Sequence, residues 1–182
     1  TSSSASSTAT ESPTFFSQRV TVPSETLSPR AGIVMTVPAP VGAGAAGAMG
    51  AGVPAALAAK SIFPNRQVIC FAGDGDFQMS ASELGTAMQE NLNPIILIHN
   101  NGSYGTIRMH QEMRYPKRVS GTNLKNPNFK CIAEAYNFGY SKITNLSEFK
   151  VAFEKAKTFD VGFIIEMLAD IKDISPGKII DL

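Results

Sequence analysis

The sequence is poor in cysteine, tryptophan and net charge, and the shortages of cysteine and of net charge each exclude a class of protein. Of 182 residues, two are cysteine and none is tryptophan. Cys70 and Cys131 lie far apart, outside any Cys-x-x-Cys pair, so we expect neither a disulfide framework nor a zinc site, and the cytoplasm is the expected compartment. A formal net charge of +1 gives no reason to expect nucleic acid or an anionic membrane as a partner. No apolar run is long enough to span a bilayer.

The first forty residues differ in composition from the rest. About half of residues 1–30 are Ser or Thr, without a steady apolar period, and this composition predicts a disordered, low-complexity segment over 1–40. The segment has no apolar stretch of the kind that signal peptides carry, and no initiator Met, so we expect a truncated, processed or fused end. One folded domain is predicted over 41–182.

Apolar strands alternate with helical patterns along that domain. Continuous apolar runs predict buried strands, and periodic segments predict helices, one of them with Pro54 in its first turn. This alternation predicts an α/β fold with a parallel sheet covered by helices on both faces. The predicted strands are 66–72, 94–99 and 163–168, and the predicted helical segments are 47–60, 80–91, 128–138 and 146–159.

Two predicted strands end in unusual polar sequences. Gly73-Asp74-Gly75 follows the first strand, and Asn100-Asn101 follows the second about 25 residues later. In parallel sheets, ligands bind beyond the carboxyl ends of the strands. A carboxylate and an amide oxygen there suit a hard cation such as Mg²⁺, and backbone amides between small residues suit phosphate oxygens. We expect the two glycines to permit tight turns and close approach, although each motif alone is typical of an ordinary turn.

Together these motifs resemble the diphosphate-binding motif of thiamine-diphosphate enzymes. The segment GAMGAGVPAALAAK, from Gly47 to Lys60, is similar to the one that precedes the motif in this family, and GAMG resembles the acetolactate synthase group of 2-oxoacid decarboxylases and carboligases. The resemblance implies the thiamine-diphosphate-binding fold, with thiamine diphosphate and Mg²⁺ as cofactors. It assigns Mg²⁺ to Asp74, Asn101 and the Ser103 carbonyl, and it places Met49 under the bent cofactor. The implied cofactor-binding residues are Gly47, Met49, Gly73, Asp74, Gly75, Asp76, Phe77, Asn101, Ser103, Tyr104, Gly105 and Thr106.

The sequence departs from the family at three positions. Asp76 stands where many members carry Ser, and it would repel a diphosphate unless its side chain turns away or binds an amide. Ile107 stands about where pyruvate decarboxylases place a catalytic Glu, and His110 about where acetolactate synthases have Trp. The resemblance therefore disfavours pyruvate decarboxylase activity and typical acetolactate synthesis.

The activating Glu of the family belongs to a separate pyrimidine-binding domain, and nothing before Gly47 resembles that domain. The resemblance implies a lyase or transferase that is incomplete without a pyrimidine-binding domain or subunit, a homo- or hetero-oligomer, and a 2-oxoacid substrate. No catalytic residue is expected on this chain. The alternatives are a non-catalytic cofactor-binding subunit or degenerate fragment.

A weaker alternative is an NAD-dependent oxidoreductase. Residues 42–47 match G-x-G-x-x-G, but the preceding TVPAPV contains two prolines and makes a poor strand. The basic stretch 108–118 is either a lid or substrate-carboxylate site, or a solvated helix face.

Overall fold

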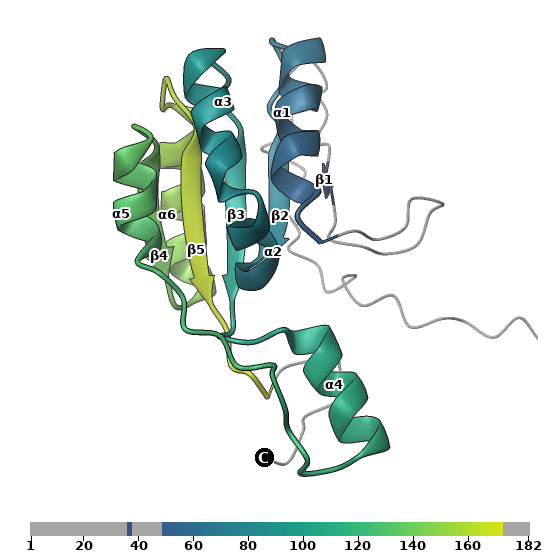
Figure 1. The fold of residues 1–182 in the computed structure, drawn as a ribbon. Helices are drawn as coiled ribbons and strands as arrows, with labels where there is room; N and C mark the ends of the chain where they lie inside the picture. Colours follow the sequence, from purple (N-terminus) through teal and green to yellow (C-terminus); the bar gives the residue numbers. More distant parts are fainter. Residues whose placement is uncertain (1–35, 38–48, 173–182) are drawn as a thin grey trace, which may run out of the picture.

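The computed structural model describes residues 36–37 and 49–172. Five parallel strands form one sheet, in the order β1-β2-β3-β5-β4 (Figure 1). Because every strand runs the same way, all carboxyl ends lie at one edge, which is where ligands bind in such sheets. The strands are β1 (Thr36–Val37), β2 (Ile69–Gly73), β3 (Ile95–Asn100), β4 (Gly139–Ile143) and β5 (Phe163–Leu168).

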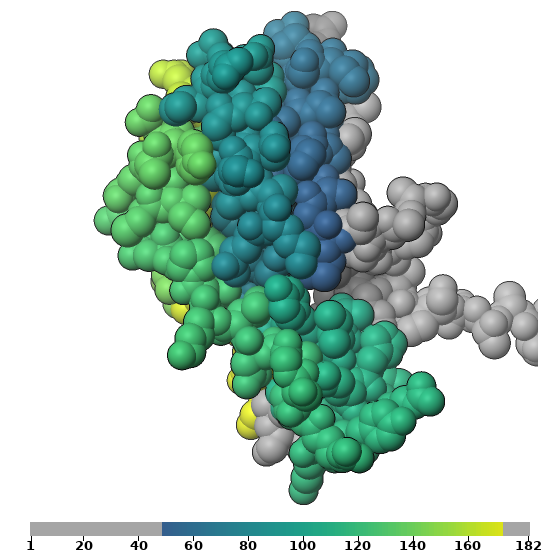
Figure 2. Space-filling model, viewed as in Figure 1, coloured from purple at the N-terminus to yellow at the C-terminus, as the bar shows by residue number. Residues whose placement is uncertain are grey.

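Helices cover both faces of the sheet. Four of them (α1, α2, α3 and α5) lie on one face and α6 lies on the other, while α4 projects beyond the carboxyl edge (Figure 1). The space-filling view shows α4 and its flanking loops as a lobe below the sheet (Figure 2). The helices are α1 (Gly52–Ile62), α2 (Asp74–Met79), α3 (Leu84–Gln89), α4 (Gly105–Arg114), α5 (Phe129–Ala135) and α6 (Leu146–Lys157), with a 3₁₀ turn at Ala81–Glu83 before α3.

The two helical layers explain why the strands are continuously apolar. Alternate residues of one strand point to opposite faces, and both faces here are covered. On β3, Ile96 and Ile98 belong to the core under α1, α2, α3 and α5, whereas Ile95 and Leu97 belong to the core under α6. The predicted α/β fold with a parallel sheet is therefore confirmed.

Asparagine caps set the starts of two helices. The side chain of Asn128 accepts hydrogen bonds from the amides of Lys130 and Cys131 at the start of α5. Asn145 accepts one from the amide of Glu148 at the start of α6, and Glu148 in turn accepts from the amide of Thr144. These contacts satisfy amides that have no partner inside a helix.

Three elements differ from the sequence predictions. The prediction did not include β4, because its sequence GYSKI carries few apolar residues. The predicted helix over 80–91 begins with the 3₁₀ turn and ends at Gln89, since Asn91 has a left-handed φ of 53° that a helix does not accommodate. The turn expected at Gly73-Asp74-Gly75 is the start of α2.

The sheet also includes part of the predicted low-complexity segment. Thr36 and Val37 pair with Ile69 and Cys70 as the short strand β1. The domain boundary at residue 41 stays a prediction, and residues 1–35 and 38–48 lie outside the described part of the chain.

Candidate functional site

Asp74 is a buried carboxylate at the point where β2 ends and α2 begins. Only 2% of the surface of Asp74 is exposed to solvent. Oδ1 accepts a hydrogen bond from the amide of Gly75 at 2.9 Å, and Oδ2 accepts from the amide of Gly102 at 2.8 Å and from Nδ2 of Asn126 at 2.6 Å. An anion is favoured at a helix N-terminus, and these donors fix the orientation of the side chain.

The turn after β3 faces Asp74. Gly102 has a left-handed φ of 66°, which glycine adopts without strain, and its amide points at Asp74. Oδ1 of Asn101 accepts a hydrogen bond from the amide of Ser103 at 3.0 Å, and the Ser103 hydroxyl donates to the carbonyl of Thr122 at 2.9 Å. The loop that follows α4 therefore holds this turn in place.

The structure brings the three expected metal ligands to one turn. Asp74 accepts a hydrogen bond from the amide of Gly102, and the Asn101 side chain accepts one from the amide of Ser103, which is the next amide of the turn after β3. It is Asn100, however, that shares two donors with Asp74, because its Oδ1 also accepts from Gly102 and Asn126. The roles of Asp74, Asn101 and Ser103 as ligands remain a prediction.

Asp76 joins the upstream loop to this motif. Its Oδ1 accepts a hydrogen bond from the amide of Gly50 at 2.5 Å, in the loop that carries the exposed Met49. Burial raises the pKa of the Asp76 carboxyl, and the Gly50 amide offsets part of that shift. The side chain thus binds an amide, one of the two conditions that the sequence set for a carboxylate beside a diphosphate. Gly47 lies outside the described residues.

Of the two motif glycines, Gly75 permits a close approach, whereas a Cβ on Gly73 would make only an ordinary contact, 3.9 Å from Cβ of Asp76. Neither Gly73 nor Gly75 has a positive φ, so the expectation of tight turns was wrong. A Cβ on Gly75 would lie 2.4 Å from Cε1 of Tyr104, and one on Gly105 would lie 2.9 Å from Nδ2 of Asn101. The absence of a side chain at Gly75 lets the Tyr104 ring pack against the start of α2.

Two other predicted cofactor-binding residues, Phe77 and Thr106, differ from each other in exposure. The side chain of Phe77 is fully buried against Phe129, so only its backbone could face a ligand. Thr106 is exposed in the first turn of α4. Neither is among the residues that donate hydrogen bonds to the Asp74 carboxylate.

Charge around Asp74 is unbalanced. Among the described residues, the ion pairs involve other carboxylates, such as Glu112 with Arg108 inside α4 at 2.9 Å, and no cationic side chain pairs with Asp74. Residues 49–172 also contain no cluster of three or more His, Cys, Asp or Glu suited to a metal. A cation held here would therefore be bound by one carboxylate with amide and carbonyl oxygens, which is the chemistry of Mg²⁺ rather than of zinc.

The basic stretch does not act as one unit. Arg108 is buried and paired with Glu112, whereas His110 and residues 113–118 are exposed. This arrangement agrees with a solvated helix face for most of the stretch.

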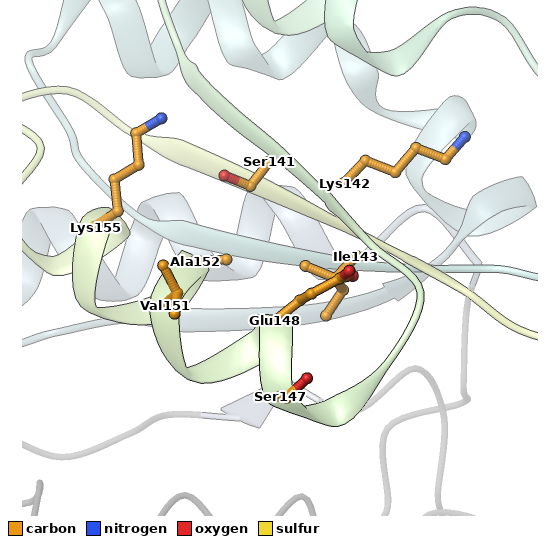
Figure 3. Close-up of a pocket in the computed structure, with 8 residues that line it drawn as sticks. All are labelled: Ser141, Lys142, Ile143, Ser147, Glu148, Val151, Ala152 and Lys155. Atoms are coloured by element: carbon orange, nitrogen blue, oxygen red, sulfur yellow. The ribbon is translucent and has the colours of Figure 1, made fainter.

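A shallow groove of about 550 Å³ lies elsewhere, between β4 and α6. Ile143 of β4 lines one side of it and Val151 and Ala152 of α6 line the other, and Lys142 extends away from α6 (Figure 3). Because α6 covers the sheet face opposite α2, the groove is separate from the Asp74 site.

Sequence reasoning missed three residues around Asp74. Asn126 contacts Asp74 directly, Gln78 contacts Asn126, and Glu166 contacts Asn100. The sequence offered only one signal for any of them, namely the acidic residue within the otherwise apolar run FIIEML.

The described part of the chain has no helix long and apolar enough to cross a membrane. A parallel α/β sheet with a buried carboxylate and a helix N-terminus at its carboxyl edge is the architecture of domains that bind phosphate-bearing cofactors.

Comparison with known proteins identifies the family. The model for the C-terminal TPP-binding domain of thiamine pyrophosphate enzymes matches residues 34–167, and the chain belongs to this family. Within it, the chain is acetolactate synthase-like. It is 37% identical over 146 residues to the acetolactate synthase large subunit of Buchnera aphidicola subsp. Schlechtendalia chinensis, covering 78% of this chain and 25% of that protein. The acetolactate synthase isozyme 2 large subunit of Escherichia coli K12 is 33% identical over 125 residues, covering 68% and 23%.

A solved structure shows the same fold. The thiamine diphosphate-dependent 4-hydroxybenzoylformate decarboxylase of Rhodococcus jostii RHA1 superimposes with a TM-score of 0.64 at 31% identity, covering 68% of this chain and 24% of that one. The chain thus spans about a quarter of the length of the relatives it matches.

Proposed function

We propose that this chain holds the diphosphate of thiamine diphosphate through Mg²⁺, as part of a 2-oxoacid decarboxylase or carboligase. The observation that carries the proposal is Asp74, a carboxylate 2% exposed that receives three N–H donors and, within the described residues, no cationic partner. A buried charge is costly unless it is paired, and a bound Mg²⁺ would supply the missing countercharge.

The residues of the site fit that role. Asp74, Asn101 and the Ser103 carbonyl would offer oxygen ligands to Mg²⁺, and backbone amides in the first turn of α2 would be donors for the diphosphate oxygens. Asp76 holds the loop of Met49 against α2 through Gly50. Thiamine diphosphate, when bound, supplies the electron sink for loss of CO₂ from a 2-oxoacid. The described residues of this chain bind and orient it.

A second domain or subunit completes this proposed enzyme. The family match covers only a C-terminal TPP-binding domain. A pyrimidine-binding partner would bring the activating Glu, so lyase or transferase activity is proposed for the oligomer and not for this chain alone. The cytoplasm is the proposed compartment, which is supported by Cys70 and Cys131 both being free thiols.

The test compares two carboxylates at the same edge of the sheet. Asp74→Ala should abolish the Mg²⁺-dependent rise in melting temperature that thiamine diphosphate gives the 182-residue chain; at a hundred times Kd, that rise corresponds to about 2.7 kcal/mol. Asp170→Asn is the matched control, because Asp170 is exposed just beyond β5. A rise retained in Asp74→Ala would refute the metal assignment.

The remaining alternative is a non-catalytic cofactor-binding subunit or degenerate fragment. A pyrimidine-domain partner distinguishes it, since decarboxylation of a 2-oxoacid on mixing supports the enzyme, and binding without turnover supports the non-catalytic subunit. The family match gives no support to the NAD-dependent alternative.

A further inference from the structure

We propose that Glu166 and Asn126 are positioning residues that fix the Asp74 carboxylate for Mg²⁺, through a chain of hydrogen bonds that crosses from β5 to α2. This inference rests on the proposed function and deepens it. Neither residue belongs to the Gly-Asp-Gly or Asn-Asn motif. Glu166 lies inside β5, and Asn126 lies in the loop before α5.

The chain begins at a buried carboxylate. Glu166 is 4% exposed, and its Oε1 accepts a hydrogen bond from Nδ2 of Asn100 at 2.7 Å. Its Oε2 accepts from the hydroxyl of Tyr140, and Nζ of Lys142 lies 3.4 Å from Oε1. These contacts explain how an acidic residue is tolerated within an apolar strand.

The carboxylate dictates the orientation of the Asn100 amide. A carboxamide has one donor end and one acceptor end, and an ionised carboxylate only accepts. Asn100 must therefore turn Nδ2 toward Glu166, which leaves Oδ1 facing the other way. That oxygen accepts from the amide of Gly102 at 3.2 Å and from Nδ2 of Asn126 at 2.8 Å.

Asn126 transmits this orientation to Asp74. Its Nδ2 donates to Asn100 and, at 2.6 Å, to Oδ2 of Asp74, while its Oδ1 accepts from Nε2 of Gln78 at 2.8 Å. A reversed Asn126 amide would set an oxygen against two acceptors. Because Glu166 and Asp74 both accept hydrogen bonds, only this orientation of the Asn100 and Asn126 amides satisfies every donor and acceptor in the chain.

As a consequence, the Asp74 carboxylate is held in one orientation before a metal binds. Oδ2 of Asp74 is held by Asn126 and Gly102, and Oδ1 by the amide of Gly75. Partners of this kind, which contact a ligand rather than the metal, are worth about ten- to a hundred-fold in metal affinity.

The first experiment titrates Mg²⁺ by calorimetry at saturating thiamine diphosphate, using the 182-residue chain. Asn126→Ala should weaken Mg²⁺ about ten- to a hundred-fold. Asn128→Ala is the matched control. It is the same residue type in the same loop, but its side chain caps α5, so its loss should lower the melting temperature and leave Mg²⁺ affinity unchanged within about two-fold.

Glu166 is tested by rescue and by coupling. Glu166→Gln keeps an acceptor for Asn100 and should bind Mg²⁺ within about three-fold of wild type, whereas Glu166→Leu should lose about ten-fold. Because both residues act through one chain of bonds, Asn126→Ala combined with Glu166→Leu should bind no more weakly than Asn126→Ala alone. Losses that multiply in the double variant, or an Asn126→Ala variant with wild-type affinity, overturn the inference.

A second readout needs no cofactor. The amide of Gly102 donates to both Asp74 and Asn100, so its hydrogen exchange, followed by NMR, should rise at least about ten-fold in Glu166→Leu and in Asn126→Ala. Unchanged exchange overturns the chain of bonds whatever the cofactor does.

The two failures are distinguishable. Wild-type chain that takes up no Mg²⁺ with thiamine diphosphate, even with a pyrimidine-domain partner present, refutes the proposed function, and the positioning role falls with it. Wild-type chain that binds, with Asn126→Ala binding equally well, refutes the positioning role alone.

Discussion

Phe77 joins the candidate site to the core. Replacing it with alanine should lower the free energy of unfolding far more than the same change at Phe159, which belongs to a similar pair of aromatic rings. Phe77 packs edge-to-face on Phe129 with ring centroids 5.6 Å apart, and Phe159 does the same with Phe163 at 5.3 Å. The exposed fractions differ, at 0% for Phe77 and 38% for Phe159.

The expected magnitudes follow from that difference. The ring-pair contribution of about 0.5–1.5 kcal/mol is common to both. Phe77→Ala also leaves a cavity under α2 and should lower the free energy of unfolding by about 3–5 kcal/mol. Phe159 buries only part of its surface and borders solvent, so Phe159→Ala should lose about 1–2 kcal/mol.

Urea unfolding followed by far-ultraviolet circular dichroism measures both losses, and the chain has no tryptophan to use instead. Equal losses in the two variants would refute the placement of Phe77 in the core. Phe77→Leu should recover most of the stability and, because the backbone amide is retained, the binding of thiamine diphosphate as well.

Three further predictions concern the same region. Gly75→Ala should reduce thiamine diphosphate binding in calorimetry, because the new methyl would lie 2.4 Å from Cε1 of Tyr104 and displace its ring; unchanged binding would contradict this. Burial raises the pKa of the Asp76 carboxyl above its ordinary value of 3.8, so the protonated carboxyl stabilises the folded chain below pH 3.8, and this stabilisation is lost as pH rises through the raised pKa. Over that pH interval, the melting temperature should therefore fall less in Asp76→Asn than in wild type. Burial raises the pKa of Cys70 to about 12, so a thiol reagent should label the exposed Cys131 in the folded chain and both thiols in denaturant; rapid labelling of Cys70 without denaturant would contradict its burial.

The sequence was most informative where apolar runs were continuous. The runs that became β2, β3 and β5 stood out because both faces of the sheet are covered, so every residue along them is apolar. The edge strand β4 was not predicted, since a strand with one neighbour keeps polar residues such as Ser141 and Lys142. Local pattern alone carries no information on such a strand.

Some residues of the candidate site could likewise be predicted from the sequence, and others could not. Asp74 and Asn101 could be found from their positions after two strands, and the amide contact of Asp76 was one of two outcomes set by its charge. Asn126 could not be found, because its contact with Asp74 spans 52 residues and depends on where the loop before α5 lies. The start of α2 was hidden by Gly73-Asp74-Gly75, whose residue types are equally typical of a turn.

Titration calorimetry of the 182-residue chain with thiamine diphosphate, in the presence and absence of Mg²⁺, tests the central claim most directly. We expect binding that requires Mg²⁺ and disappears in Asp74→Ala. Binding of equal strength without Mg²⁺, or no binding with Mg²⁺ and a pyrimidine-domain partner both present, would contradict it.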